Sequence, residues 1–183
     1  MRHKLESACL AKPGPWSAWL PVTLICLMLL GCGYQMAGIG SLPGGVQALA
    51  VHTFKNRTGR TNLEMTVTNA VITELNRRGK KVINKDQRPD AILTGTLVSL
   101  TRKTISRSSE NRTAERNVTI HVALTLTHND GRILWQRQDI QEDQDYAVND
   151  TDTSAMDAGL SSAVDQLAKR LAETVVRQLT ENF

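Results

Sequence analysis

Two segments of the chain repeat apolar residues at the spacing of an α-helix. The first stripe comprises Leu63, Val67, Ala70, Val71 and Leu75. The second lies within residues 154–180 and comprises Met156, Leu160, Val164, Leu167, Leu171, Val175 and Leu179. A spacing of about 3.6 residues places each stripe on one helix face, so both segments are predicted to pack that face against a core. Thr61-Asn62-Leu63-Glu64 has the pattern of a capping box, and Arg77-Arg78-Gly79 that of a helix terminator.

Five other segments have the composition of β-strands, namely residues 46–54, 81–84, 90–107, 115–128 and 132–145. Within 115–128 valine, isoleucine and leucine alternate with threonine and histidine, which is typical of a sheet with one covered and one polar face. Asn129-Asp130-Gly131 is typical of a hairpin turn. The element order β-α-β-β-β-α predicts an α+β fold. We expect two helices on one face of a mixed, mostly antiparallel sheet of about four to five strands.

The first 31 residues have the pattern of a signal peptide. Arg2, Lys4 and Lys12 precede an apolar run, residues 22–30, which is too short to cross about 30 Å of hydrocarbon. The run ends in Leu29-Leu30-Gly31-Cys32, which resembles a bacterial lipobox, although Leu30 replaces the small residue that is more usual there. We predict cleavage before Cys32 and attachment of an N-acyl diacylglycerol lipid to its thiol. An uncleaved N-terminal anchor is the alternative.

This cleavage divides the chain into three parts. Residues 1–31 would be the signal peptide, residues 32–45 a lipidated N-terminus and flexible glycine-rich tether, and residues 46–183 the folded domain. Gly33, rather than aspartate, follows the lipidated residue, which favours the outer membrane. Cys9 and Cys26 would leave with the signal peptide, so the mature chain could form no disulfide and no cysteine metal site.

Composition excludes several classes of protein. The 183 residues are 40% hydrophobic and 22% charged, with a mean hydropathy of -0.27, which matches neither a disordered polymer nor a multispan membrane protein. Without the signal peptide, 19 Lys and Arg face 17 Asp and Glu, a net charge of +2 that does not imply nucleic-acid binding. His121 and His128 are seven residues apart on a strand and therefore face opposite ways. Catalytic, nucleotide and metal motifs are absent from the sequence, so we expect no enzyme activity, no cofactor and no metal site.

Charged residues gather in three places. Around the tip of the first long hairpin five cations face only Glu110 and Glu115, which gives a local charge of +3; the cations are Arg102, Lys103, Arg107, Arg112 and Arg116. Guanidinium groups bind phosphate in bidentate fashion, so this tip is the candidate binding site, with an ordinary solvated turn as the alternative. A second basic group is expected to cap a helix and flank a strand: Arg77, Arg78, Lys80, Lys81, Lys85 and Arg88. An acidic group before the last helix lacks the spacing of a calcium loop and is expected in a solvated loop: Asp139, Glu142, Asp143, Asp145, Asp150 and Asp152.

Four short motifs occur in order along the mature chain. They are Cys32-Gly33-Tyr34, Val51-His-Thr-Phe-Lys-Asn-Arg-Thr58, Ala91-Ile-Leu-Thr-Gly95 and Gly131-Arg-Ile-Leu-Trp135. Together they resemble the lipopolysaccharide-assembly lipoprotein family LptE. The resemblance implies an outer-membrane lipoprotein, lipid-anchored at the periplasmic face, whose domain plugs the lumen of the LptD β-barrel in a 1:1 complex.

That resemblance also implies a function. The protein would assist assembly of the barrel and insertion of lipopolysaccharide into the outer leaflet, and the basic tip would contact the phosphates of lipid A. A periplasm-facing lipoprotein that regulates a cell-wall synthase is the alternative, because it would share the lipid anchor and a small domain of α-helices and β-strands.

Overall fold

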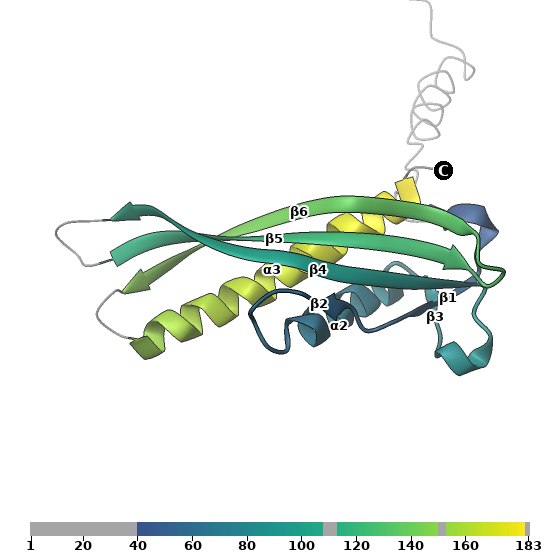
Figure 1. Cartoon of the computed structure of the whole chain (residues 1–183), viewed down its shortest axis with the longest axis horizontal. Coiled ribbons are helices and arrows are strands. Elements are labelled where there is room, and N and C mark those ends of the chain that lie inside the picture. The colour runs from purple at the N-terminus through teal and green to yellow at the C-terminus, as the bar shows by residue number, and fades with distance from the viewer. Residues whose placement is uncertain (1–39, 108–112, 150–152, 182–183) are drawn as a thin grey trace, which may run out of the picture. The chain divides into compact units, whose positions relative to one another are not determined.

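The computed structural model describes residues 40–107, 113–149 and 153–181. Within these ranges six strands form one sheet and two α-helices pack on it (Figure 1). The strands are β1 (Ala48–Val51), β2 (Lys55–Asn56), β3 (Lys81–Val82), β4 (Ala91–Arg107), β5 (Thr113–His128) and β6 (Ile133–Asn149). The helices are α2 (Leu63–Arg77) and α3 (Thr153–Glu181), with short 3₁₀ turns η1 (Pro43–Gly45) and η2 (Lys85–Gln87).

The sheet is mixed and mostly antiparallel. Its order is β3-β1-β4-β5-β6, with β2 also paired to β4. Strands β1 and β2 run parallel to their partners, whereas the three long strands β4, β5 and β6 form antiparallel pairs. The predicted α+β fold is confirmed. The segment 46–54 forms only β1, because the Phe54 amide leaves the sheet and donates to Thr68 Oγ1 on α2 at 3.1 Å.

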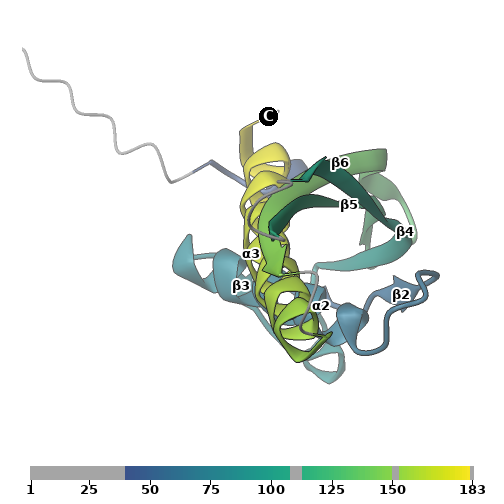
Figure 2. The same cartoon turned by 90° about the vertical axis from the view of Figure 1, so that its left-hand side faces the viewer.

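Both helices bury most of the apolar stripes that define them, but Ala70 and Met156 are only half-buried. Leu63, Val67, Val71 and Leu75 on α2 are at most 2% exposed. The stripe of α3 from Leu160 to Leu179 is buried against β6 and against α2, and the two helices lie side by side on one face of the sheet (Figure 2). No helix among the described residues is long and apolar enough to cross a membrane.

The predicted capping box of α2 is wrong, but its terminator is confirmed. Asn62 is the N-cap residue and has a left-handed backbone, φ 63°, so no side chain caps the first turn. The Glu64 carboxylate instead accepts a hydrogen bond from Asn56 Nδ2 at 2.6 Å, which fastens the helix start to β2. At the other end Gly79 has a φ of 70°, the left-handed conformation that glycine adopts without strain.

The alternation predicted for β5 is confirmed. Its valines, isoleucine and leucines from Val118 to Leu126 face the helices and are at most 1% exposed. Threonines and His121 between them face the other way and are half-buried on the uncovered face of the sheet. Trp135 on β6 is 6% exposed and belongs to the core.

Packing begins before Val46. Leu42 is 4% exposed, Pro43 is buried, and η1 lies against β6. Residues 40–45, which the sequence suggested to be part of a flexible tether, therefore contact the domain.

Candidate functional site

The register between β4 and β5 shows where the basic residues of the hairpin lie. Arg102 stands opposite Val118 and Thr104 opposite Arg116, whereas Lys103 stands opposite Asn117. Residues directly opposite in an antiparallel pair share a face, and Val118 is buried beneath the helices. Arg102 and Arg116 therefore lie on the helix side of the sheet, and Lys103 lies on the uncovered side. The five predicted cations do not all share one face; Arg112 and the side chain of Arg107 lie outside the described residues.

Arg102 lines a cleft of about 480 Å³ on the helix side. The other walls come from the loop before α2, from the first turns of α3 and from β4: Gly59, Arg60, Thr61, Leu100, Asp157, Leu160 and Ser161. The Arg60 guanidinium donates to Ser161 Oγ at 3.1 Å, which joins the loop to α3. Two guanidinium groups against the single carboxylate of Asp157 give the cleft a net charge of +1, and with Leu100 beside them they suit a ligand that carries an anionic group on an apolar body.

Arg60 was missed by the sequence reasoning. It lies 42 positions before Arg102 in a loop, with no periodic pattern around it. Only the packing of that loop against α3 and β4 brings the two arginines into one cleft. No local sequence signal could have identified it.

The uncovered face of the sheet is mostly polar along the three long strands, with Ile92 and Ile133 as apolar exceptions near the β5–β6 turn. On β6 it carries Asp139, Asp143 and Asp145. Asp139 Oδ1 is 2.8 Å from His121 Nδ1, and Asn117 Nδ2 donates to Asp143 and Asp145 at 2.9 and 2.7 Å. His121 and His128 lie on opposite faces, as predicted, because His128 pairs with buried Ala91.

The prediction that the acidic residues lie in a solvated loop is wrong for four of them. Asp139, Glu142, Asp143 and Asp145 belong to strand β6, which continues to Asn149. Glu142 faces the helices and accepts a hydrogen bond from Thr174 Oγ1 of α3 at 2.6 Å. The remaining acidic residues, Asp150 and Asp152, lie outside the described ranges. Alternation along the strand thus divides the acids between the two faces.

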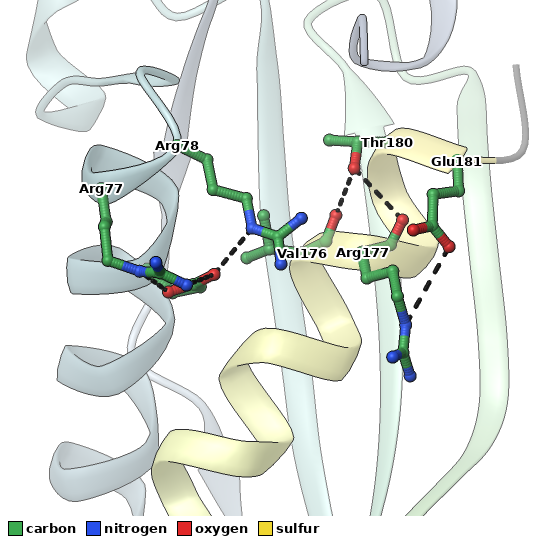
Figure 3. Close-up of polar contacts among 7 residues, drawn as sticks. Arg77, Arg78, Val176, Arg177, Thr180 and Glu181 are labelled. Atoms are coloured by element: carbon green, nitrogen blue, oxygen red, sulfur yellow. Dashed lines mark hydrogen bonds and ion pairs between the residues drawn. The ribbon is translucent and has the colours of Figure 1, made fainter. Parts of the chain in front are cut away.

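The second basic cluster is largely structural. Arg77 and Arg78 both donate to the buried carboxylate of Glu74, at 2.6 to 2.8 Å (Figure 3). The hydrogen bond from Arg77 is the main cause that holds the pKa of Glu74 below its usual value, against the opposing effect of burial. Lys80 Nζ donates to the carbonyl oxygen of Gly40. These three of the six cations therefore support the end of α2 and the N-terminal segment, whereas Lys81, Lys85 and Arg88 are exposed.

Comparison with known proteins gives one family. The model of the family LptE, described as lipopolysaccharide-assembly, matches residues 46–179. No curated protein matches the chain. Among solved structures, an uncharacterized lipoprotein B from Nitrosomonas europaea is similar, with 19% identity over 80% of this chain and 88% of that chain, at a TM-score of 0.53. A minor lipoprotein from Acinetobacter baumannii has 12% identity over 75% and 92%, at a TM-score of 0.51. At these identities the two structures support the fold alone.

Proposed function

The chain belongs to the LptE family of lipopolysaccharide-assembly lipoproteins, and from this premise we propose that it partners and plugs an LptD-like outer-membrane β-barrel in a 1:1 complex. Membership of this family makes it a non-enzymatic assembly lipoprotein and implies that it is located at the outer membrane. The proposed role is to assist assembly of the barrel and insertion of lipopolysaccharide into the outer leaflet. Cleavage after residue 31 and lipidation of Cys32 at the periplasmic face are part of the same proposal.

The observation that carries the plug proposal is the uncovered face of β4, β5 and β6. Threonine, serine, asparagine, glutamine and aspartate side chains occupy most of it, with Ile92 and Ile133 as apolar exceptions near the β5–β6 turn, and the interior wall of an outer-membrane barrel is likewise polar. Strand β4 has 17 residues, which at about 3.3 Å each extend about 56 Å. That length exceeds the roughly 30 Å of the hydrocarbon core, so the strands are long enough to line a lumen from end to end.

The proposed contact for lipopolysaccharide is the distal part of the hairpin and the adjoining cleft. Arg102 and Arg60 line that cleft and Arg116 lies on the same side of the sheet, whereas Lys103 lies on the uncovered side and is proposed to face the barrel wall instead. Arg107 and Arg112 are proposed from the sequence alone. Guanidinium groups would bind the phosphates of lipid A, while Leu100 and Leu160 offer an apolar surface beside them.

Co-purification tests the proposal. Tagged full-length protein is extracted from outer membranes, and we expect a 1:1 complex with a large β-barrel. Thr119→Trp places a bulky group on the uncovered face and should reduce the complex, whereas Gln166→Trp, at an exposed position of α3, should not. Recovery of a penicillin-binding protein without a barrel would favour the cell-wall alternative. Equal recovery of the barrel with both variants would exclude the uncovered face as its contact.

A further inference from the structure

The segment of residues 40–45, called the docked segment below, is held at three places. The Gly40 carbonyl accepts a hydrogen bond from Lys80, in the loop after α2. A Cβ atom built on Gly40 would lie 2.8 Å from Thr180 Cβ and closer still to the Thr180 carbonyl oxygen, so only glycine fits against α3 here. A Cβ on Gly44 would lie 2.9 Å from Leu134 Cδ2 on β6. Leu42 and Pro43 between these glycines are buried.

Thr180 is itself fixed, which makes it a firm surface for Gly40. It is 8% exposed, and its hydroxyl donates to the carbonyl oxygens of Val176 and Arg177 at 2.9 and 3.2 Å (Figure 3). Arg177 and Glu181 form an ion pair at 4.0 Å on the exposed side of the same turn. The last turn of α3 therefore presents a rigid backbone to the docked segment.

All three contacts lie at one end of the domain, called the base below. The base contains the ends of α2 and α3 and the turn between β5 and β6 (Figure 1). The last residues of β4 and the first of β5 lie at the opposite end, where Thr113 pairs with Asn149 and Gly159 of α3 lies near Val148. Helix α3, with 29 residues at about 1.5 Å each, covers about 43 Å between the two ends.

We propose that the docked segment makes the base the end of the domain that faces the lipid surface. This inference rests on the proposed lipidation of Cys32. Eight residue steps separate Cys32 from Gly40, and at up to about 3.6 Å each they reach at most about 29 Å. If the chain packed against the domain only from Val46 onward, the tether from Cys32 would have 14 residue steps and would reach about 50 Å. That reach is close to the roughly 56 Å length of β4.

The difference in reach decides the orientation. A tether of about 50 Å nearly equals the length of β4 and would let the domain tilt until its tip is close to the membrane, whereas about 29 Å is only about half that length and keeps the base closest. Exposed charges at the base have an excess of cations: Lys81, Lys85, Arg88 and Arg132 against Asp86 and Asp130. These cations would favour the same end on an anionic surface, so the release variants below are needed to separate the effect of the tether from that of charge.

Energy transfer to a lipid surface tests this inference without a barrel. The mature sequence has no cysteine other than Cys32, so a single introduced cysteine can carry a dye. Lipidated mature protein, residues 32–183, is placed on vesicles of phosphatidylethanolamine and phosphatidylglycerol that carry a headgroup acceptor. We expect several-fold stronger transfer from Asn129→Cys, in the base turn, than from Lys103→Cys, toward the tip; both positions are exposed.

Release of the docked segment should remove the difference. Gly40→Val cannot fit against Thr180, so transfer from the two dyes should become similar. Gly59→Val is the matched control, because a Cβ there meets nothing within 4 Å. Lys80→Ala provides a second release variant should Gly40→Val not fold. Equal transfer from both dyes in the parent, or an unchanged difference in both release variants, would overturn the orientation. A parent that fails to bind vesicles would overturn the lipid anchor instead.

Discussion

The buried carboxylate of Glu74 accepts two hydrogen bonds from Arg77, at 2.6 and 2.8 Å. The Glu74 side chain is only 7% exposed, and Arg78 donates a third bond at 2.7 Å. Both arginines come from the last turn of the same helix or its cap, one and two positions before Gly79. The end of α2 is thus held by charge-assisted hydrogen bonds that depend on ionisation of one carboxylate.

Glu74→Gln should lower the free energy of unfolding by about 1–3 kcal/mol near neutral pH, since bonds to an ionised group are lost from a buried position. The folded-state pKa of Glu74 lies below the ordinary value of 4.5, so its contribution is complete above that pH. It is lost as the pH falls through the folded pKa. Urea unfolding should therefore show the parent and variant converging in acid. Glu181→Gln, at a 63% exposed carboxylate, is the control and should change little. A pH-independent gap would contradict the role of the charge.

Leu167→Asp should destabilise the domain by several kcal/mol, because Leu167 is 1% exposed and an unpaired charge would be buried there. The neighbouring change Gln166→Asp is exposed and should have little effect. Thermal unfolding of both purified variants measures the difference. Equal melting temperatures would mean that this part of α3 leaves the core in solution.

Cys32→Ala should abolish lipidation, since the mature sequence contains no other thiol to receive diacylglycerol. The protein should accumulate as a soluble or signal-retaining form. Palmitate labelling of cells measures this directly. Labelling that persists in the variant would show that Cys32 is not the acceptor.

Periodicity predicts the long elements because each repeats its signal many times. The alternation of β5 and the stripe of α3 from Leu160 onward identified buried residues correctly, whereas Met156, at the start of that stripe, is only half-buried. Periodicity does not predict hydrogen bonds between residues that are 8 to 14 positions apart in the sequence. The bond from the Phe54 amide to Thr68 ends the strand that was expected to continue. The bond from Asn56 to Glu64 takes the place of the expected helix cap.

The β-bulge at Val98 explains why the faces of the basic residues could not be read from the sequence. Simple alternation from buried Leu97 places Lys103 on the helix side and Arg102 on the uncovered side. The register shift between Leu97 and Ser99 adds one residue and reverses both assignments. Val98 itself is 45% exposed, and nothing in its type signals a bulge.

Arg107→Glu combined with Arg112→Glu should weaken lipopolysaccharide binding and leave the melting temperature unchanged, if the hairpin tip contacts phosphate. The sequence predicts both arginines to be exposed, and exposed charges usually contribute less than about 1 kcal/mol to folding. The double variant should therefore lose binding while its melting temperature stays the same. Binding by the purified protein is measured at low and high salt. Equal binding of parent and double variant at low salt would remove the tip from the mechanism.

Arg102→Glu and Lys103→Glu compare adjacent residues on opposite faces of the sheet. Arg102 lines the cleft with Arg60, whereas Lys103 lies on the face proposed to meet the barrel wall. Loss of a bond to a phosphate costs about 1.5–3 kcal/mol. At about 1.4 kcal/mol per tenfold, Arg102→Glu should weaken lipopolysaccharide binding roughly ten- to a hundredfold.

Lys103→Glu should instead weaken recovery of the barrel and leave lipopolysaccharide binding nearly unchanged. Lys85→Glu, an exposed cation at the base, controls for the change in net charge. The effect of Arg102→Glu should shrink as salt rises, since charges are screened over about 10 Å at 0.1 M. If all three variants lose binding equally, long-range charge rather than the cleft attracts the ligand. If only Lys103→Glu loses it, the phosphate contact lies on the uncovered face, and the cleft between β4 and α3 is not the binding site.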